Sequence, residues 1–543
     1  TTYHITRDRT QPRERTFPPA LPFSSPQTSL LALLASSTLY NDPPCYFSAS
    51  YVTRLTNLFL VSNIDSAFSR ATVTMVQPRF LLITYPIQGH VNPSLQFAKR
   101  LAAIGVHVTF ATSVYLHRRM LKKPTVPGLS FVTFSDGYDD GYKTTEDSHV
   151  NSYMAELKRR GSEFLGNIIT SAKEEGKPFT CLTYTLMLPW VAKVAREFRI
   201  PGVLLWIQPA TVLDIYYHYF HEYRDYINTI HKSENSIIDF PGLPFSLATR
   251  DVPSFLLPSN AYSFAIPSLE EQFKLFDEET NPRVLVNTFQ DLEPEALKAI
   301  DKLTMISIGP LIPSAFLDGK DPTDTSFGAD IYNGSNDYIE WLDSKPALSV
   351  VYVSFGTLAV LGQRQMEEVA RALLDSGYPF LWVIREPNGK QEKLEELSCR
   401  KELEERGKIV NWCSQVEVLS HGSLGCFLTH CGWNSTMESL SSGIPMVSFP
   451  QWSDQGTNAK LVEDVWKTGV RVDGKANAEG IVDGEEIRKC LEVVMGSGEK
   501  RDELRRNAEK WKCLAREAVK EGGSSDRNIR TFLDYVAGLD RIV

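Results

Sequence analysis

Short apolar runs alternate with amphipathic stretches along most of the chain. The run FLLITYP (80–86) is followed by the polar loop QGHVNP, in which Pro93 suits the first turn of a helix. Leu95, Ala98 and Leu101 then recur at helical spacing before a second apolar run, VHVTFAT. This order of strand, loop, helix and strand predicts a βαβ unit, and repeated units of this kind build a parallel sheet.

The same order of elements restarts in the C-terminal half. SVVYVSFGT (349–357) is a predicted strand, 363–376 a helix and PFLWVIR (379–385) another strand, and a charged helical tail begins at 484. We therefore expect an α/β protein with two doubly wound, Rossmann-like domains facing each other across a cleft. In such folds, ligands bind at the carboxyl ends of the strands.

The composition changes at two places along the chain. Before Met75, the first methionine, the sequence is rich in Ser, Thr, Pro and Arg and contains no lysine. This composition resembles a plastid transit peptide, and the alternative is a translated leader that the cell does not make. In either case we expect little packing there. We predict an unstructured leader or transit-like extension at 1–74, an N-terminal domain at 75–320, a linker at 321–346, a C-terminal domain at 347–523, and a helix at 524–543 that packs back on the N-terminal domain.

Charge, hydropathy and cysteine content exclude several classes of protein. The 543-residue chain has a formal net charge of −9, whereas nucleic-acid binding calls for a basic face. No stretch provides the roughly 18 apolar residues of a membrane span. The 8 cysteines include no CxxC pair, which favours reduced thiols in the cytoplasm. We therefore expect neither a nucleic acid nor a membrane as a partner.

Motifs of common cofactor and hydrolase sites are also missing. The chain contains no GxGxxG after a strand, no GxxxxGK[ST] and no GxSxG. Cys426, His430 and Cys431 lie close together, but they lack the spacing and the second ligand pair of a zinc site. We therefore expect no bound metal and no resident cofactor.

One segment, from Trp412 to Gln455, concentrates groups that suit a nucleotide sugar. Trp412 ends a predicted strand and can stack on a flat base. Gln415 and Glu438 can bond to ribose hydroxyls. Each of these residues taken alone could equally be a core aromatic or a polar surface residue, so the interpretation rests on the group.

The stretch THCGWNST provides an anion site in the same segment. A predicted strand ends at His430, Gly432 permits a tight turn, and Asn434 and Ser435 suit the cap of the helix that follows. Free N–H groups at a helix N-terminus beside a histidine favour a phosphate. Farther on, the paired carboxylate and amide of 454–455 can grip vicinal sugar hydroxyls, although they could also simply cap a helix.

The whole segment resembles the secondary-product glycosyltransferase box of plant family-1 UDP-glycosyltransferases. The chain from Met75 onward is also similar to that family, with FSDGYDDG, VYVSFGT and PGLP. The branch that it resembles holds flavonoid or anthocyanin glucosyltransferases and enzymes that form glucose esters, such as crocetin glucosyltransferase. The resemblance implies a GT-B fold whose N-terminal domain binds the acceptor and whose C-terminal domain binds UDP-glucose. We expect a monomer that uses no metal.

The resemblance also implies a role for each residue of the donor site. It implies that Trp412 stacks on uracil and that Cys413 binds uracil through its backbone. It also implies that Gln415 and Glu438 bind ribose. It implies that the diphosphate is bound by Thr357, His430, Asn434 and Ser435, with Gly432 in the same turn. It also implies that the sugar is bound by Trp433, Asp454 and Gln455. Gln at this last position usually accompanies glucose in the family.

His90, in the first predicted loop, is the candidate general base. A histidine titrates near neutrality and can take a proton from an acceptor hydroxyl, although it could instead cap the helix. The family usually orients this histidine with an aspartate, in text like YDSFLPW, whereas this chain reads YTLMLPW with Thr185 at that position. A threonine cannot stabilise the imidazolium by charge. We therefore expect acidic acceptors, either phenols or carboxylic acids, because a carboxylic acid is already ionised at neutral pH.

The expected reaction is a single displacement at the anomeric carbon with inversion, and it moves glucose to a hydroxyl or carboxyl group of a small plant phenolic, flavonoid or terpenoid acid. Trp206, Gln208 and the aromatic run 216–220 are candidates for the acceptor pocket. The alternatives are a non-catalytic nucleotide-sugar binder and an enzyme that acts on a nucleotide sugar without an acceptor.

Overall fold

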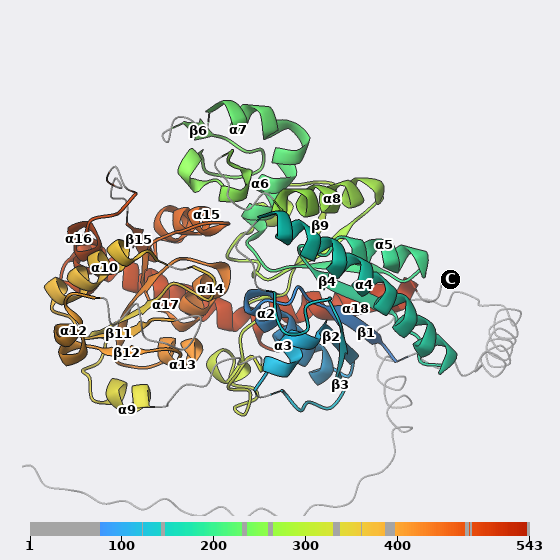
Figure 1. Ribbon diagram of the computed structural model, residues 1–543, viewed down its shortest axis with the longest axis horizontal. Helices are drawn as coiled ribbons and strands as arrows, with labels where there is room; N and C mark the ends of the chain where they lie inside the picture. Colours follow the sequence, from blue (N-terminus) through green and yellow to red (C-terminus); the bar gives the residue numbers. More distant parts are fainter. Residues whose placement is uncertain are drawn as a thin grey trace, which may run out of the picture. The chain divides into compact units, whose positions relative to one another are not determined.

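The βαβ units predicted from the sequence build two parallel sheets (Figure 1). The computed structural model describes residues 77–121, 123–142, 147–230, 236–258, 264–328, 337–359, 361–385, 397–472, 477 and 480–539. All of them belong to one compact unit, Val76–Val543. The leader predicted at 1–74 lies outside the described residues, as does part of the linker predicted at 321–346.

The first sheet has seven strands in the order β3-β2-β1-β4-β5-β8-β9. Every neighbouring pair is parallel. The strand order reverses beside β1, whose neighbours are β2 and β4, and this reversal is where doubly wound folds bind ligands. The strands are β1 (Arg79–Ile83), β2 (His107–Ser113), β3 (Leu129–Phe134), β4 (Cys181–Thr185), β5 (Gly202–Trp206), β8 (Arg283–Val286) and β9 (Thr304–Ser307).

Helices connect these strands, and a small hairpin lies beyond β5. The hairpin pairs β6 (Ile237–Ile238) with β7 (Leu247–Ala248) in antiparallel fashion. The helices of this half are α2 (Gln88–Ala103), α3 (Val114–Arg119), α4 (Asp147–Glu174), α5 (Trp190–Glu197), α6 (Ala210–His218), α7 (Arg224–Ile230) and α8 (Ala265–Glu278).

The second sheet has six parallel strands in the order β12-β11-β10-β13-β14-β15. Its order reverses between β10 and β13. The strands are β10 (Val350–Ser354), β11 (Phe380–Val383), β12 (Lys408–Val410), β13 (Leu424–Thr429), β14 (Met446–Ser448) and β15 (Gly469–Arg471). The helices are α9 (Asp337–Asp343), α10 (Gln363–Ser376), α12 (Arg400–Arg406), α13 (Gln415–Leu419), α14 (Trp433–Ser442), α15 (Gln455–Lys460), α16 (Gly484–Met495), α17 (Glu499–Val519) and α18 (Ser524–Leu539).

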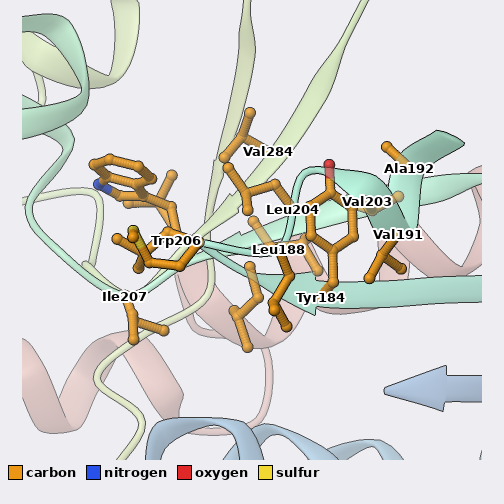
Figure 2. Packing of buried hydrophobic residues seen from close by; sticks show 14 of the residues in the cluster. Tyr184, Leu188, Val191, Ala192, Val203, Leu204, Trp206, Ile207 and Val284 are labelled. Atoms are coloured by element: carbon orange, nitrogen blue, oxygen red, sulfur yellow. The ribbon is translucent and has the colours of Figure 1, made fainter. Parts of the chain in front are cut away.

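The inner strands of the first sheet are buried on both faces, as their near-continuous apolar sequences predict, whereas the edge strands β3 and β9 are partly exposed. Figure 2 shows this packing around β4, β5 and α5, where Tyr184, Leu204 and Val191 meet. Trp206 is fully buried at the end of β5, and its indole N–H donates to the carbonyl oxygen of Pro209 over 2.9 Å. This packing fixes the ends of β4 and β5 beside the candidate site.

The chain passes between the two halves twice. It leaves β9 through a segment in which Ile312 and Leu317 form a buried cluster with Val416 and the partly buried Val519. It returns after α17, and α18 then packs on the first sheet, where Phe532 meets Phe80 edge to face and Ser525 Oγ donates to the carbonyl oxygen of Gly309 over 2.6 Å. The two crossings therefore lie side by side.

Membrane-spanning helices and metal-ligand clusters are both missing from the described residues. In that part of the chain no helix combines the length and the apolar character needed to cross a bilayer. Over the same ranges no group of three His, Cys, Asp or Glu side chains is arranged to hold a metal ion, and each described cysteine is a free thiol.

Candidate active site

A cavity opens where the carboxyl ends of both sheets meet. The first half contributes the start of α2 and residues that follow β4 and β5, and the second half contributes the loops after β10, β12, β13 and β14. His90 and all twelve residues predicted for the donor site line this one cavity. They are Thr357, Trp412, Cys413, Gln415, His430, Gly432, Trp433, Asn434, Ser435, Glu438, Asp454 and Gln455.

The end of the cavity near Trp412 carries a hydrogen-bonded amide and carboxylate. Gln415 begins α13, and its Nε2 donates to Glu438 Oε2 over 2.6 Å and to Ser435 Oγ over 2.8 Å. Burial raises the pKa of Glu438 to about 7, and the hydrogen bond from Gln415 opposes that rise. The half-buried Trp412 leaves part of its ring open to the cavity. An aromatic face beside an amide and a carboxylate suits a base and the two hydroxyls of a ribose.

His430 lies between two glycines in the loops after β10 and β13. A Cβ built on Gly356 would lie 2.5 Å from His430 Nε2, and one built on Gly432 would lie 2.6 Å from it. Burial, followed by the charge of Arg385, lowers the pKa of His430 to about 4. The imidazole is therefore neutral at physiological pH and can offer an N–H group without carrying a charge.

Helix α14 starts with Trp433 and points its N-terminus at the cavity. Its N-cap is Gly432, which makes no side-chain cap bond, so the cap predicted for Asn434 and Ser435 is wrong. Both residues already lie inside the helix, which begins at Trp433 directly after the cap. The uncapped first turn leaves backbone N–H groups available for an anion.

The side chain of Asn434 reaches across to the first half. Its Nδ2 donates to the carbonyl oxygen of Gly89 over 2.8 Å. That carbonyl is available because the residue four positions later is Pro93, which has no backbone N–H. The polar stretch predicted as a loop is thus helical from Gln88 onward, and Pro93 lies inside α2 instead of in its first turn.

Asp454 and Gln455 lie at the start of α15, next to the first half. Asp454 Oδ2 accepts from Asn458 Nδ2 over 2.8 Å, and Gln455 Oε1 accepts from the backbone N–H of Gln451 over 2.8 Å. Burial raises the pKa of Asp454, and hydrogen bonds that include one from Gln208 oppose the shift. Gln208 therefore brings the first half into contact with this carboxylate.

His90 is the third residue of α2 and not part of a loop as predicted. Its Nδ1 lies 3.0 Å from Thr185 Oγ at the end of β4. Burial lowers the pKa of His90 to about 3, so the ring is neutral at physiological pH. The strand-order reversal of the first sheet places the two residues together, since β1 and β4 are adjacent strands.

A family model described as UDP-glucoronosyl and UDP-glucosyl transferase matches residues 331–496. Phloretin 4'-O-glucosyltransferase of Malus domestica is 59% identical over 477 residues, which cover 85% of this chain and 98% of that protein. The chain belongs to the plant family-1 UDP-glycosyltransferases.

Other members of the family agree with this assignment. Crocetin glucosyltransferase, chloroplastic, of Gardenia jasminoides is 58% identical over 85% of this chain and 98% of that protein. The crystal structure of Os79 from O. sativa in complex with UDP superposes with a TM-score of 0.74 and 35% identity, covering 84% of this chain and 100% of that one. The two Rossmann-like halves of this UDP-glycosyltransferase therefore form the predicted GT-B fold.

Sequence reasoning missed several residues that line the cavity of this UDP-glycosyltransferase. They include Gln88, Arg385 and Phe327. Arg385 lies two residues after β11, so its place beyond the carboxyl end of a parallel strand was a usable signal. Phe327 lies in a polar stretch predicted as linker, where nothing in the sequence marks it.

Within the described part of the chain, only one of the candidates for the acceptor pocket lines the cavity. Gln208 lines the cavity, whereas Trp206 and 216–220 are not among the described residues that do. Trp206 and Tyr216 are almost completely buried and belong to the core of the first half. Their aromatic character reflects packing, and the polar residue between them is the one that reaches the site.

Proposed function

We propose that this UDP-glycosyltransferase moves glucose from UDP-glucose, with inversion, to a hydroxyl or carboxyl group of a small plant phenolic, flavonoid or terpenoid acid. The observation that carries the proposal is the single cavity that His90 of the first half shares with the twelve donor-site candidates of the second. Relatives named for phloretin and crocetin support both classes of acceptor.

The donor would lie along the second sheet with its uracil on Trp412. Gln415 and Glu438, already bonded to each other, would take the ribose hydroxyls. The diphosphate would lie at the N-terminus of α14, beside Thr357 and His430. Because the imidazole of His430 is neutral, its contribution would be a hydrogen bond, and the helix dipole would favour the anion.

Asp454 and Gln455 would bind the glucose, since both line the cavity where the two halves meet. The indole N–H of Trp433 donates to the carbonyl oxygen of Asn287 over 2.8 Å. Any contact of Trp433 with the sugar or diphosphate would therefore come from its backbone N–H.

Chemistry would take place between the halves. An acceptor oxygen would attack the anomeric carbon while the bond to the diphosphate breaks on the opposite face, which inverts the configuration. A hydroxyl acceptor would also lose a proton, for which His90 is the candidate base in the cavity, whereas a carboxylate has no proton to lose. Negative charge would develop on the leaving diphosphate, where the amides of α14 and the N–H of His430 would stabilise it. We propose that no metal is needed, because hydrogen bonds and the helix dipole stabilise the leaving charge.

The acceptor would lie against Leu186 and Ile207, which provide an apolar wall. Two amide oxygens also line this part of the cavity. Oε1 of Gln88 and Oε1 of Gln208 are buried and have no hydrogen-bond partner among the described residues. Each can accept a bond from a hydroxyl of the acceptor or of the sugar, which suits a ligand that combines an apolar frame with polar substituents.

An acceptor screen tests the proposal. The purified chain would be incubated with UDP-glucose and a panel of flavonoids, simple phenols and carboxylic acids, and the products would be identified by mass and by lability to alkali. We expect β-configured glucosides, glucose esters or both. Release of UDP without any glucosylated product would favour an enzyme that acts without an acceptor, and no turnover at all would favour a non-catalytic binder.

We further propose that the enzyme acts as a monomer in the cytoplasm. Both catalytic halves are present in one chain, and His90 and the donor-site residues line the same cavity without help from a second copy. Light scattering of the purified chain tests the first point, and fractionation of plant cells with an antibody to the chain tests the second.

A further inference from the structure

Three groups meet at the end of β4, and their hydrogen bonds determine where the proton of His90 lies. The backbone N–H of Tyr85 donates to Thr185 Oγ over 3.1 Å, and Thr185 Oγ lies 3.0 Å from His90 Nδ1. Thr185 is fully buried, so water does not reach its hydroxyl. Among the described residues, Thr185 Oγ has no other hydrogen-bond partner.

Counting protons selects one tautomer of the ring. The Tyr85 amide can only donate, so the hydroxyl of Thr185 accepts that bond and still holds a proton of its own. Its one acceptor among the described groups is His90 Nδ1. A buried hydroxyl proton without an acceptor is costly, and Nδ1 accepts only when it carries no proton. The neutral ring then carries its proton on Nε2.

We propose that Thr185 holds His90 as the Nε2–H tautomer, so that the ring donates a hydrogen bond to an acceptor that arrives as a carboxylate. This inference rests on the proposed function and specifies its acceptor class. Thr185 acts as a positioning residue, and His90 is the group that touches the acceptor.

Transfer of glucose to a carboxylate needs no base. One carboxylate oxygen forms the bond to the anomeric carbon, the bond from that carbon to the UDP oxygen breaks, and its electron pair leaves on UDP. No proton moves to His90, whose N–H stabilises the carboxylate before and during the attack. A phenol would require the ring to take a proton at Nε2, and that nitrogen is already protonated in this tautomer.

An aspartate at position 185 would have the opposite effect. An ionised carboxylate only accepts hydrogen bonds, so it would require the proton of His90 on Nδ1 and leave Nε2 free to take a proton. The residue at position 185, Thr or Asp, therefore determines which ring nitrogen of His90 is basic.

Acceptor kinetics test the inference with Thr185→Asp. The kcat/KM would be measured for trans-cinnamic acid and for 4-propylphenol, a neutral phenol with a pKa of about 10. We expect the phenol-to-acid ratio to rise at least tenfold in Thr185→Asp, and Thr185→Ser, which keeps the hydroxyl, to restore the ratio of the unmodified chain. An unchanged ratio in a Thr185→Asp protein that still binds UDP-glucose overturns the inference.

The tautomer is also directly observable in the full chain. ¹⁵N-histidine labelling distinguishes the protonated ring nitrogen from the bare one by chemical shift, and His90→Gln identifies the His90 signals. We expect protonated Nε2 in the unmodified chain and loss of that preference in Thr185→Val, which preserves the shape of the side chain. Protonated Nδ1 in the unmodified chain overturns the inference, whichever acceptors are used.

These readouts separate the inference from the proposed function. If the unmodified chain glucosylates neither class of acceptor, the proposed function fails and the NMR result still decides the tautomer. If it glucosylates phenols while cinnamic acid is inert, transfer of glucose stands and the carboxylate inference is overturned.

Discussion

The indole N–H of Trp433 donates to the backbone carbonyl oxygen of Asn287 over 2.8 Å. Trp433 is the first residue of α14, and Asn287 follows β8 of the first sheet. The side chain of Asn287 in turn accepts from the backbone N–H of Leu311 over 2.9 Å. The helix that points at the donor site is therefore fastened to the first half at its N-terminus.

Trp433→Phe should lower the stability of the protein, because it removes this hydrogen bond between the two halves. The substitution removes one donor and leaves the buried carbonyl of Asn287 without its partner, a loss of roughly 1–3 kcal/mol in the free energy of unfolding. Because the helix start also lies at the cavity, affinity for UDP-glucose should fall as well. Urea unfolding and calorimetry measure the two effects.

A matched control is Trp511→Phe, since Trp511 Nε1 donates to the carbonyl oxygen of Trp466 within the second half. This variant should lose stability without losing affinity. If both variants bind UDP-glucose as the unmodified chain does, the junction has no influence on the donor site.

Gly432→Ala should impair donor binding without unfolding the protein. The added Cβ would lie 2.6 Å from His430 Nε2, while the φ of −59° at Gly432 is compatible with alanine. The imidazole must therefore move, and we expect the Kd for UDP to rise at least tenfold. Gly422→Ala is the control, because nothing lies within 4 Å of a Cβ there. Equal Kd values for both variants would contradict the proposed role of His430.

Glu438 predicts a pH dependence of donor binding. Burial raises its pKa to about 7, so near and below that pH the unliganded chain holds a proton on this carboxyl. Ribose hydroxyls donate to the ionised form, so UDP-glucose should release protons when it binds, increasingly so as the pH falls through 7. Calorimetry in buffers of different ionisation enthalpy measures this release, and Glu438→Gln should abolish it.

Protonation of the Glu438 carboxyl opposes donor binding but favours folding of the unliganded chain. Since its pKa in the folded chain exceeds the ordinary value of 4.5, the folded state binds the proton more tightly than the unfolded state. The contribution of Glu438 to the stability of the unliganded chain is therefore full below pH 4.5 and is lost as the pH rises towards 7. Glu438→Gln should flatten that part of the stability profile, and an unchanged slope would rule out this ionisation as its source.

The ion pair between Asp251 and Arg471 should make a large difference to stability. Their side chains are 3% and 8% exposed, and Arg471 Nη1 donates to Asp251 Oδ1 over 2.6 Å from the second half to the first. Asp251→Ala leaves a buried guanidinium without its partner, which costs about 3–5 kcal/mol.

The exposed pair between Lys500 and Glu503 provides the comparison. Glu503→Ala should change the free energy of unfolding far less than Asp251→Ala, because water screens an exposed pair. Denaturant unfolding of both variants tests the contrast, and similar losses would show that burial does not govern the strength of the Asp251 pair.

The strands and most helices were predictable because their apolar periodicity reflects burial. The helix predicted at 363–376 matches α10, and the strand predicted at 379–385 contains β11. The start of α2 was less predictable because Pro93 suggests a first turn. In the structure Pro93 lies inside the helix, and the carbonyl of Gly89 that it leaves unpaired bonds to Asn434 from the other half.

The donor residues of the candidate site were predictable from the sequence, but most of their contacts across the two halves were not. The donor residues could be named from one contiguous segment, whereas contacts between the halves depend on distances that no local pattern contains. Trp206 looked like a pocket residue because aromatics often line pockets, but it fills the core beneath Gln208. The link between His90 and Thr185 required knowledge that β1 and β4 are neighbours.

The two adjacent crossings of the chain have a mechanical consequence. Val519, at the end of α17, packs with Ile312 and Leu317 of the outgoing segment, so the two connections contact each other through apolar side chains. Because close-packed side chains transmit displacement to their neighbours, a shift of one connection would also shift the other. A substitution that opens this contact would therefore loosen both connections at once.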